Sequence, residues 1–210
     1  MLQFITNPQS EASIVDQIRD VIDGGCRWVQ IRMKEATDDE VKEVFHAIRE
    51  KAKETETIII INDRVDLAKQ LGPEGVAGVH LGKEDMSPAQ ARNFLGPEAI
   101  IGVTVHTKDE VMKLKGLDID YVGIGPFAYT KTKENLSPVL GVEGIKELCD
   151  FIDNEGMELG KVAVGGIELD NVAELLKAGA DGIAVSGAIA HAEMITEATE
   201  AFIATRPMKE

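Results

Sequence analysis

The sequence is poor in cysteine and in positive charge, and it has no long apolar run. Its two cysteines, Cys26 and Cys149, exclude a disulfide framework or a cysteine cluster for a metal, and indicate buried thiols in a reducing cytoplasm. The formal net charge of −15 argues against nucleic acid and anionic membranes as partners, because both attract positively charged surfaces. No apolar run approaches the roughly 20 residues that span a bilayer, and the N-terminus has no signal-peptide pattern. We therefore expect a cytoplasmic protein.

The composition that is present suits a single globular domain. Hydrophobic residues make up 44% of the 210 residues and charged residues 28%. A chain of this length buries roughly 70% of the surface that its unfolded form exposes. We therefore expect one domain over residues 1–210, with a core that needs no cross-links.

Apolar runs of strand length alternate with segments of helical period along the whole chain. The expected strands are LQFIT, RWVQI, IIIIN, GVAGVHL, AIIGVTV, DYVGIG, KVAVGG and DGIAVSG. The expected helices cover residues 10–23, 38–53, 64–71, 87–95, 107–115, 144–154 and 170–178, with a last helix ending near residue 205. Strands separated by helices pair in parallel, and eight such units predict an α/β fold, a single (β/α)8 TIM barrel. The alternative is an open doubly wound sheet, but ITNPQS stands where a glycine-rich dinucleotide fingerprint would follow the first strand.

The second expected strand ends in VQIRMKE, at the end of a barrel strand where chemistry takes place. Because side chains alternate along a strand, Gln30, Arg32 and Lys34 share one face, which we expect to point into the barrel mouth. Two cations in a mouth cost desolvation energy unless an anion binds there. The alternative is a strand end that simply reaches water.

The third and fourth expected strands end in carboxylates. Asn62 and Asp63 follow four isoleucines, and GVHLGKED places Asp85 or Glu84 at the neighbouring mouth position. Two carboxylates beside two cations suit Mg²⁺ that holds a polyphosphate, because Mg²⁺ takes a few carboxylates, waters and phosphate oxygens. The alternative for Asp63 is the N-cap of the following helix.

The fifth strand end offers Thr104 and His106, while His80 lies in the fourth strand. A lone histidine is more often packed than catalytic, so neither is a leading candidate. Near the seventh and eighth strand ends, Gly165 and Gly166 allow either a tight turn or the approach of backbone N–H groups to a phosphate.

The stretch GPFAYTKTKENLSP, residues 125–138, is cationic and rich in hydroxyl groups in an acidic protein. It follows a buried strand and has no apolar period. We interpret residues 125–141 as a lid that closes over an anion. A solvated connection is the alternative.

Together these residues make the chain resemble the thiamine-phosphate synthase family along essentially its full length. The matching motifs are Gln30, Arg32 and Lys34; Asn62 and Asp63; GKED with Asp85; Thr130, Thr132 and Lys133; Gly165 to Ile167; and Ser186 with Gly187. The departures are Thr104 for a serine, Lys83 for a glutamine, Ala128 and Tyr129 for an aromatic–proline pair, and Ser186 and Gly187 for a hydrophobic residue followed by serine.

The resemblance implies that hydroxymethylpyrimidine diphosphate loses pyrophosphate and that the nitrogen of hydroxyethylthiazole phosphate takes its place. It implies that the diphosphate substrate is held by Gln30, Arg32, Lys34, Asn62, Thr104 and Lys133, with Arg32, Lys34 and Lys133 catalytic. It implies that Mg²⁺ is held by Asp63 and Asp85, and that the thiazole phosphate is held by Thr130, Thr132, Gly166, Ser186 and Gly187.

Two alternatives stay open. A barrel similar to the thiazole tautomerase would isomerise the thiazole phosphate without a diphosphate, and would need no metal and diphosphate set. A non-catalytic regulator that binds a phosphorylated metabolite would keep the phosphate glycines but need neither Asp63, Asp85 nor Lys133. The oligomeric state is not determined by these patterns.

Overall fold

Eight parallel strands close into a barrel in the computed structural model, which describes residues 1–129 and 138–205. The strands are β1 (Leu2–Ile5), β2 (Trp28–Ile31), β3 (Ile58–Asn62), β4 (Val76–Leu81), β5 (Ile100–Val105), β6 (Tyr121–Ile124), β7 (Gly160–Val164) and β8 (Gly182–Val185). Each strand pairs with the next in the sequence, and β8 pairs with β1. The predicted TIM barrel is confirmed, and the open sheet is wrong.

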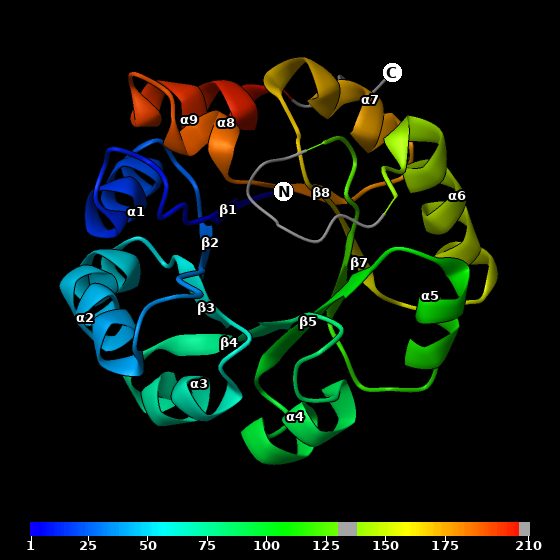
Figure 1. Cartoon of the computed structure of the whole chain (residues 1–210), viewed down its shortest axis with the longest axis horizontal. Coiled ribbons are helices and arrows are strands. Elements are labelled where there is room, and N and C mark those ends of the chain that lie inside the picture. Colours follow the sequence, from blue (N-terminus) through cyan, green and yellow to red (C-terminus); the bar gives the residue numbers. More distant parts are fainter. Residues whose placement is uncertain (130–137, 206–210) are drawn as a thin grey trace.

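Helices surround the strands on the outside of the barrel (Figure 1). They are α1 (Ile14–Asp23), α2 (Asp38–Glu54), α3 (Val65–Leu71), α4 (Pro88–Leu95), α5 (Lys108–Leu114), α6 (Gly141–Asn154), α7 (Val172–Lys177), α8 (Gly187–Ala190) and α9 (Ile195–Ala204), with 3₁₀ turns at Gly72–Glu74 and Leu169–Asn171. Among the described residues, no helix is long and apolar enough to cross a membrane.

Helix boundaries follow the capping residues. Helix α1 begins at Ile14 rather than at Ser10, because the Ser13 side chain accepts a hydrogen bond from the backbone N–H of Asp16 and so caps the helix there. The expected last helix is two helices, α8 and α9, with a break at residues 191–194.

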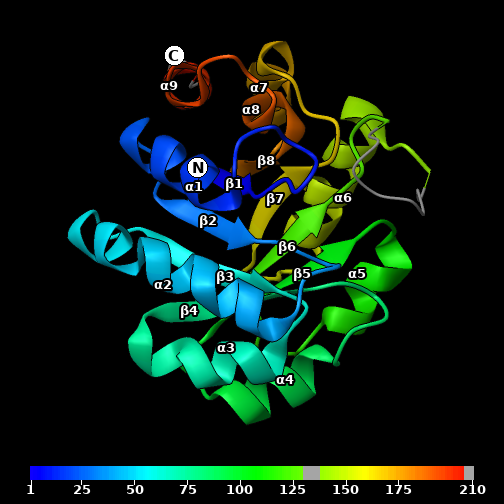
Figure 2. The same ribbon diagram turned by 60° about the vertical axis from the view of Figure 1, so that its left-hand side comes forward.

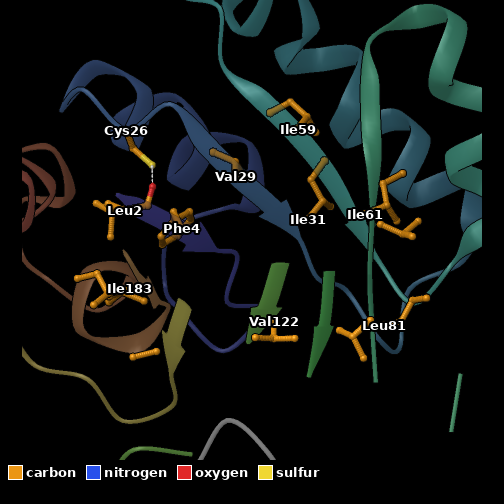
Figure 3. Close-up of a cluster of buried hydrophobic side chains, with 14 of the residues drawn as sticks. Leu2, Phe4, Cys26, Val29, Ile31, Ile59, Ile61, Leu81, Val122 and Ile183 are labelled. Atoms are coloured by element: carbon orange, nitrogen blue, oxygen red, sulfur yellow. Dashed lines mark hydrogen bonds between the residues drawn. The ribbon is translucent and has the colours of Figure 1, made fainter. Parts of the chain in front are cut away.

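The outward faces of the strands pack against the helices and form the main core. Figure 3 shows Phe4 of β1, Val29 and Ile31 of β2, and Ile59 and Ile61 of β3, all of which are fully buried. The alternation predicted for β2 is therefore confirmed on its apolar side, where Met33 also packs against this core.

The inward faces form a separate, smaller cluster inside the barrel. Its buried members are Trp28, Ile60, Tyr121, Val162 and Ala184. The Trp28 and Tyr121 rings meet edge to face, with centroids 4.7 Å apart. The polar side chains of Gln3 on β1 and Gln30 on β2 are also buried inside the barrel. Since the strands run in parallel, their C-terminal ends meet at one end of the barrel, as the arrowheads of β2 and β6 show in Figure 2.

Candidate active site at the barrel mouth

The first group of mouth residues comes from the end of β2. Gln30 is buried in the barrel, Arg32 is half-buried, and Lys34 is exposed. The backbone of Arg32 is tied to the end of β1: its N–H donates to the Thr6 hydroxyl oxygen over 2.8 Å, and that hydroxyl donates to the Arg32 carbonyl over 3.1 Å. The end of β1 therefore determines where the Arg32 side chain leaves the strand.

The guanidinium of Arg32 makes no hydrogen bond within residues 1–129 and 138–205. Burial lowers the pKa of Arg32 below its ordinary value, and the negative charge of Asp63 opposes this shift. A half-buried cation whose donors are unused gains most from an anion that restores the lost solvation. Arg32 is therefore suited to bind a phosphate group.

The carboxylate of Asp63 interacts with charged side chains from two neighbouring loops, those of Lys34 and Asp85. Its carboxylate lies 3.5 Å from the ammonium nitrogen of Lys34. Its pKa is raised from 3.8 to about 6, first by burial, then by a hydrogen bond and charge repulsion from Asp85, while Lys34 lowers it. The structure thus brings together Lys34, Asp63 and Asp85, and Glu84 points to solvent instead. Two neighbouring carboxylates that repel each other favour the binding of a divalent cation.

Asp63 has a left-handed backbone, with φ of 65°. Its N–H donates to the carbonyl of His80 on the neighbouring strand over 2.9 Å. The residue that caps α3 is Arg64, without a side-chain cap bond. The N-cap interpretation of Asp63 is therefore wrong. Asp tolerates this conformation better than most residues, which fits a carboxylate at a sharp turn out of the strand.

Arg64 holds the loop that carries Lys34. Its guanidinium donates to the carbonyls of Met33 (2.9 Å), Lys34 (3.3 Å) and Ala36, and to the carboxylate of Asp38 (2.6 Å). Lys34, Asp63 and Arg64 also line one cavity of about 330 Å³. Arg64 therefore links the β2 loop to the turn that places Asp63.

Asp85 is held by its own turn. One oxygen of its carboxylate accepts a hydrogen bond from the Gly82 N–H over 2.6 Å. In the described part of the chain, no three His, Cys, Asp or Glu side chains come together as a metal site. The pair Asp63 and Asp85 therefore fits a cation that takes most of its oxygen ligands from water and phosphate, as Mg²⁺ does.

The ends of β6 and β7 are joined by the backbone. The N–H of Phe127 donates to the carbonyl of Val164 and that of Ala128 to the carbonyl of Gly165, each over 2.9 Å. Gly165 and Gly166 both have positive φ, of 96° and 66°. A Cβ on Gly166 would lie 2.8 Å from the Ala128 carbonyl oxygen, so a side chain there would displace the chain after β6.

The end of β8 carries an unused hydroxyl. Ser186 Oγ is buried and has no hydrogen-bond partner in the described residues. A Cβ on the adjacent Gly187 would meet His191 Cδ2 at 3.6 Å and Asn7 Nδ2 at 3.9 Å. An unpartnered buried hydroxyl costs free energy unless a ligand satisfies it.

The remaining predicted positions are those in the loop after β6 and those at the end of β5. Thr130, Thr132 and Lys133 lie outside the described residues. Thr104 lies inside the barrel, 2.8 Å from Nε2 of His80. His106 contacts the carbonyl oxygen of Gly125 through Nδ1, which supports the chain after β6.

Sequence reasoning missed several polar residues of the barrel interior and mouth. These are Gln3, Asn7, Arg64, Tyr121 and His191, and His80 has more hydrogen bonds than a lone strand histidine suggests. The inward parity of β1 and β6 places Gln3 and Tyr121 on the faces that line the barrel, and this signal was available. The contact between Asn7 Nδ2 and His191 Nε2, at 3.3 Å, joins the segment after β1 to the segment after α8, and no sequence pattern indicates it.

Comparisons with known proteins identify the family of the chain. A family model described as thiamine monophosphate synthase matches residues 2–189. A thiamine-phosphate synthase of Bacteroides fragilis is 43% identical over 199 residues, covering 95% of this chain and 96% of that protein. One from Bacteroides thetaiotaomicron is 44% identical over 192 residues, covering 91% and 90%. The solved thiamine phosphate pyrophosphorylase of Pyrococcus furiosus superposes with a TM-score of 0.83 at 32% identity, covering 97% of this chain and 93% of that one. The chain therefore belongs to the thiamine monophosphate synthase family.

Proposed function

We propose that this barrel condenses hydroxymethylpyrimidine diphosphate with hydroxyethylthiazole phosphate, giving thiamine phosphate and pyrophosphate. The bond between the pyrimidine methylene carbon and the diphosphate oxygen breaks, and its electron pair leaves with pyrophosphate. The thiazole nitrogen supplies the pair for the new C–N bond. The observation that carries the proposal is the ion pair of Asp63 with Lys34, together with the effect of Asp85 on the pKa of Asp63.

On the diphosphate side, we assign binding to Gln30, Arg32, Lys34, Asn62, Thr104 and Lys133. Arg32, Lys34 and Lys133 are the catalytic cations of this set. Negative charge grows on the pyrophosphate as its bond breaks, so these cations bind the transition state more tightly than the substrate. The unused donors of Arg32 support this role.

Asp63 and Asp85 are the proposed Mg²⁺ ligands. When bound, Mg²⁺ would supply positive charge that neutralises the leaving pyrophosphate. The raised pKa of Asp63, about 6, supports this assignment, because a cation relieves the repulsion between the two carboxylates.

On the thiazole side, we assign the phosphate to Gly166, Ser186 and Gly187, with Thr130 and Thr132 from the loop after β6. The buried hydroxyl of Ser186, which has no hydrogen-bond partner in residues 1–129 and 138–205, supports this pocket. Gly187 adds a position at which only a hydrogen atom separates the backbone from the ligand.

We further propose that the single barrel over residues 1–210 carries the whole reaction and that it works in the cytoplasm, which its two free, buried cysteines support. The test is to incubate the purified chain with Mg²⁺ and both substrates, and to measure thiamine phosphate and pyrophosphate. Equal amounts of both products are expected. Isomerisation of the thiazole phosphate alone would support the tautomerase-like function, and binding without turnover would support the regulator.

A further inference from the structure

Five polar side chains form a continuous hydrogen-bonded network across the inside of the barrel. Gln30 Nε2 donates to Gln3 Oε1 over 3.2 Å, and Gln3 Nε2 donates to the Tyr121 hydroxyl oxygen over 3.2 Å. The Tyr121 hydroxyl lies 2.8 Å from His80 Nδ1, and His80 Nε2 lies 2.8 Å from the hydroxyl of Thr104. The network therefore starts and ends at two residues assigned to the diphosphate substrate.

The distances in the network are compatible with a direction that runs from Gln3 to Thr104. The Tyr121 oxygen accepts from Gln3, and burial raises the Tyr121 pKa, so the phenol keeps its single proton. In this direction, the phenol donates that proton to Nδ1 of His80. A neutral imidazole that accepts at Nδ1 carries its proton on Nε2. That proton then points to the oxygen of Thr104. The hydroxyl proton of Thr104 is then available to a ligand as a hydrogen-bond donor, and the amide oxygen of Gln30 is available as an acceptor.

The chain makes room for this network with two glycines. A Cβ on Gly102 would lie 2.0 Å from the Tyr121 ring carbon Cζ, and a Cβ on Gly123 would lie 3.1 Å from His80 Cε1. Barrel interiors are commonly filled by branched aliphatic side chains, and a buried polar network is unfavourable unless every member is satisfied. Among the described residues, the inward-facing aliphatic side chains of Ile60, Val162 and Ala184 cluster with Trp28 and Tyr121. A polar network in this position indicates that its side chains have a role beyond packing.

We propose that Tyr121 and His80 are positioning residues that hold Thr104 as a hydrogen-bond donor and Gln30 as an acceptor toward the heterocycle of the diphosphate substrate. The inference rests on the proposed function for the identity of that substrate. A ring with a donor group beside a ring nitrogen, as in an aminopyrimidine, matches this pair. A ring that places an acceptor opposite Gln30 and a donor opposite Thr104 does not match it.

The first test is Tyr121→Phe, which removes the hydroxyl and keeps the ring beside Trp28. Without that donor, the His80 proton can move to Nδ1, and Nε2 then accepts a hydrogen bond from the Thr104 hydroxyl. We expect the KM for the pyrimidine diphosphate to rise about tenfold, the effect of one buried hydrogen bond, with the KM for the thiazole phosphate unchanged. Ile60→Val, in the aliphatic layer, is the control that should lower the Tm alone. A Tyr121→Phe variant that loses only Tm would overturn the proposal.

A double-mutant cycle separates positioning from packing. Thr104→Val removes the hydroxyl that Tyr121 is proposed to orient, and Thr104→Ser keeps it. The double variant Tyr121→Phe, Thr104→Val should bind the diphosphate no more weakly than Thr104→Val alone, because both changes break the same path. Thr104→Ser should retain the wild-type KM. Additive losses in the double variant would show independent roles and contradict the proposal.

A spectroscopic measurement on the unaltered protein is independent of variant folding. Nitrogen-15 NMR of labelled histidine distinguishes a protonated from an unprotonated ring nitrogen. We expect His80 to be neutral with its proton on Nε2 in the ligand-free protein, and a proton on Nδ1 would overturn the direction of the network. This result stands even if the chain makes no thiamine phosphate, which would contradict the proposed function but not the network.

Discussion

The ammonium nitrogen of Lys34 lies 3.5 Å from the carboxylate of Asp63, whose other neighbour is the carboxylate of Asp85. One cation against two carboxylates leaves an excess of negative charge at this point of the mouth. Two residues before Lys34, the guanidinium of Arg32 is half-buried and makes no hydrogen bond to another described residue. A divalent cation and a diphosphate arriving together would balance both groups, which explains why charges of opposite sign are kept side by side in the protein.

Asp63→Asn should make the free energy of unfolding of the metal-free protein depend less on pH. The pKa of Asp63 is raised from 3.8 to about 6, so the native state binds more protons than the unfolded state between these values. The stabilisation from this group is complete below 3.8 and is lost as pH rises through about 6. Urea unfolding without Mg²⁺ should show this decline in wild type, and a flatter profile in the variant.

Asn is the right replacement for that measurement, because the left-handed backbone of Asp63 would add strain to most other side chains. Asp63→Asn should also be more stable than wild type at neutral pH without metal, since it removes the repulsion from Asp85. If its stability falls with pH as steeply as in wild type, Asp63 is not the group that titrates.

Asp85→Asn should raise the concentration of Mg²⁺ needed for turnover while leaving the fold intact. The amide oxygen of Asn can still accept the bond from the Gly82 N–H, so the turn is preserved. Activity against Mg²⁺ concentration is the measurement, with Glu84→Gln as the matched control because Glu84 is exposed. Normal turnover by Asp85→Asn at limiting Mg²⁺ would remove Asp85 from the metal site.

Arg64→Ala should weaken binding of the pyrimidine diphosphate through Lys34. The substitution removes every hydrogen bond between Arg64 and the β2 loop, and we expect the KM for the diphosphate to rise about tenfold, equivalent to one charge-assisted bond. Arg49→Ala is the control, since Arg49 forms an exposed ion pair with Glu74. Equal effects of the two substitutions would mean that only total charge matters.

Gly187→Val should raise the KM for the thiazole phosphate. A Cβ at this position meets only ordinary contacts with His191 and Asn7, so the fold accepts it, and the two methyl groups would enter the space next to Ser186. Steady-state kinetics with each substrate varied in turn would measure the effect. A rise in the KM for the pyrimidine diphosphate alone would show that the two pockets are assigned the wrong way round.

Lys133→Ala should lower turnover at saturating substrates by about 10- to 100-fold, as expected for one charge-assisted bond that strengthens in the transition state. Lys131→Ala should change it little. Both lysines lie outside the described residues, so this prediction depends on the family resemblance. If both substitutions act equally, general attraction of the anion is sufficient, and if neither acts, the loop is a solvated connection.

The sequence by itself determined the barrel and the positions of most mouth residues. Eight apolar strands that alternate with helical segments predict a closed parallel barrel. The alternation within VQIRMKE separates Gln30 from the core-facing Val29 and Ile31. These patterns are local, because each depends on the period of a single element. Helix ends were less well predicted, as the late start of α1 shows.

Only the tertiary structure decided which polar groups meet. Gln3, His80 and Tyr121 come from β1, β4 and β6, and their hydrogen bonds form because barrel closure brings inward-facing side chains of distant strands together. The raised pKa of Asp63 likewise requires Asp85 from the next strand end. Such contacts depend on the stagger of the strands and on the small size of Gly102 and Gly123, so they are a property of the assembled barrel, which no single segment encodes.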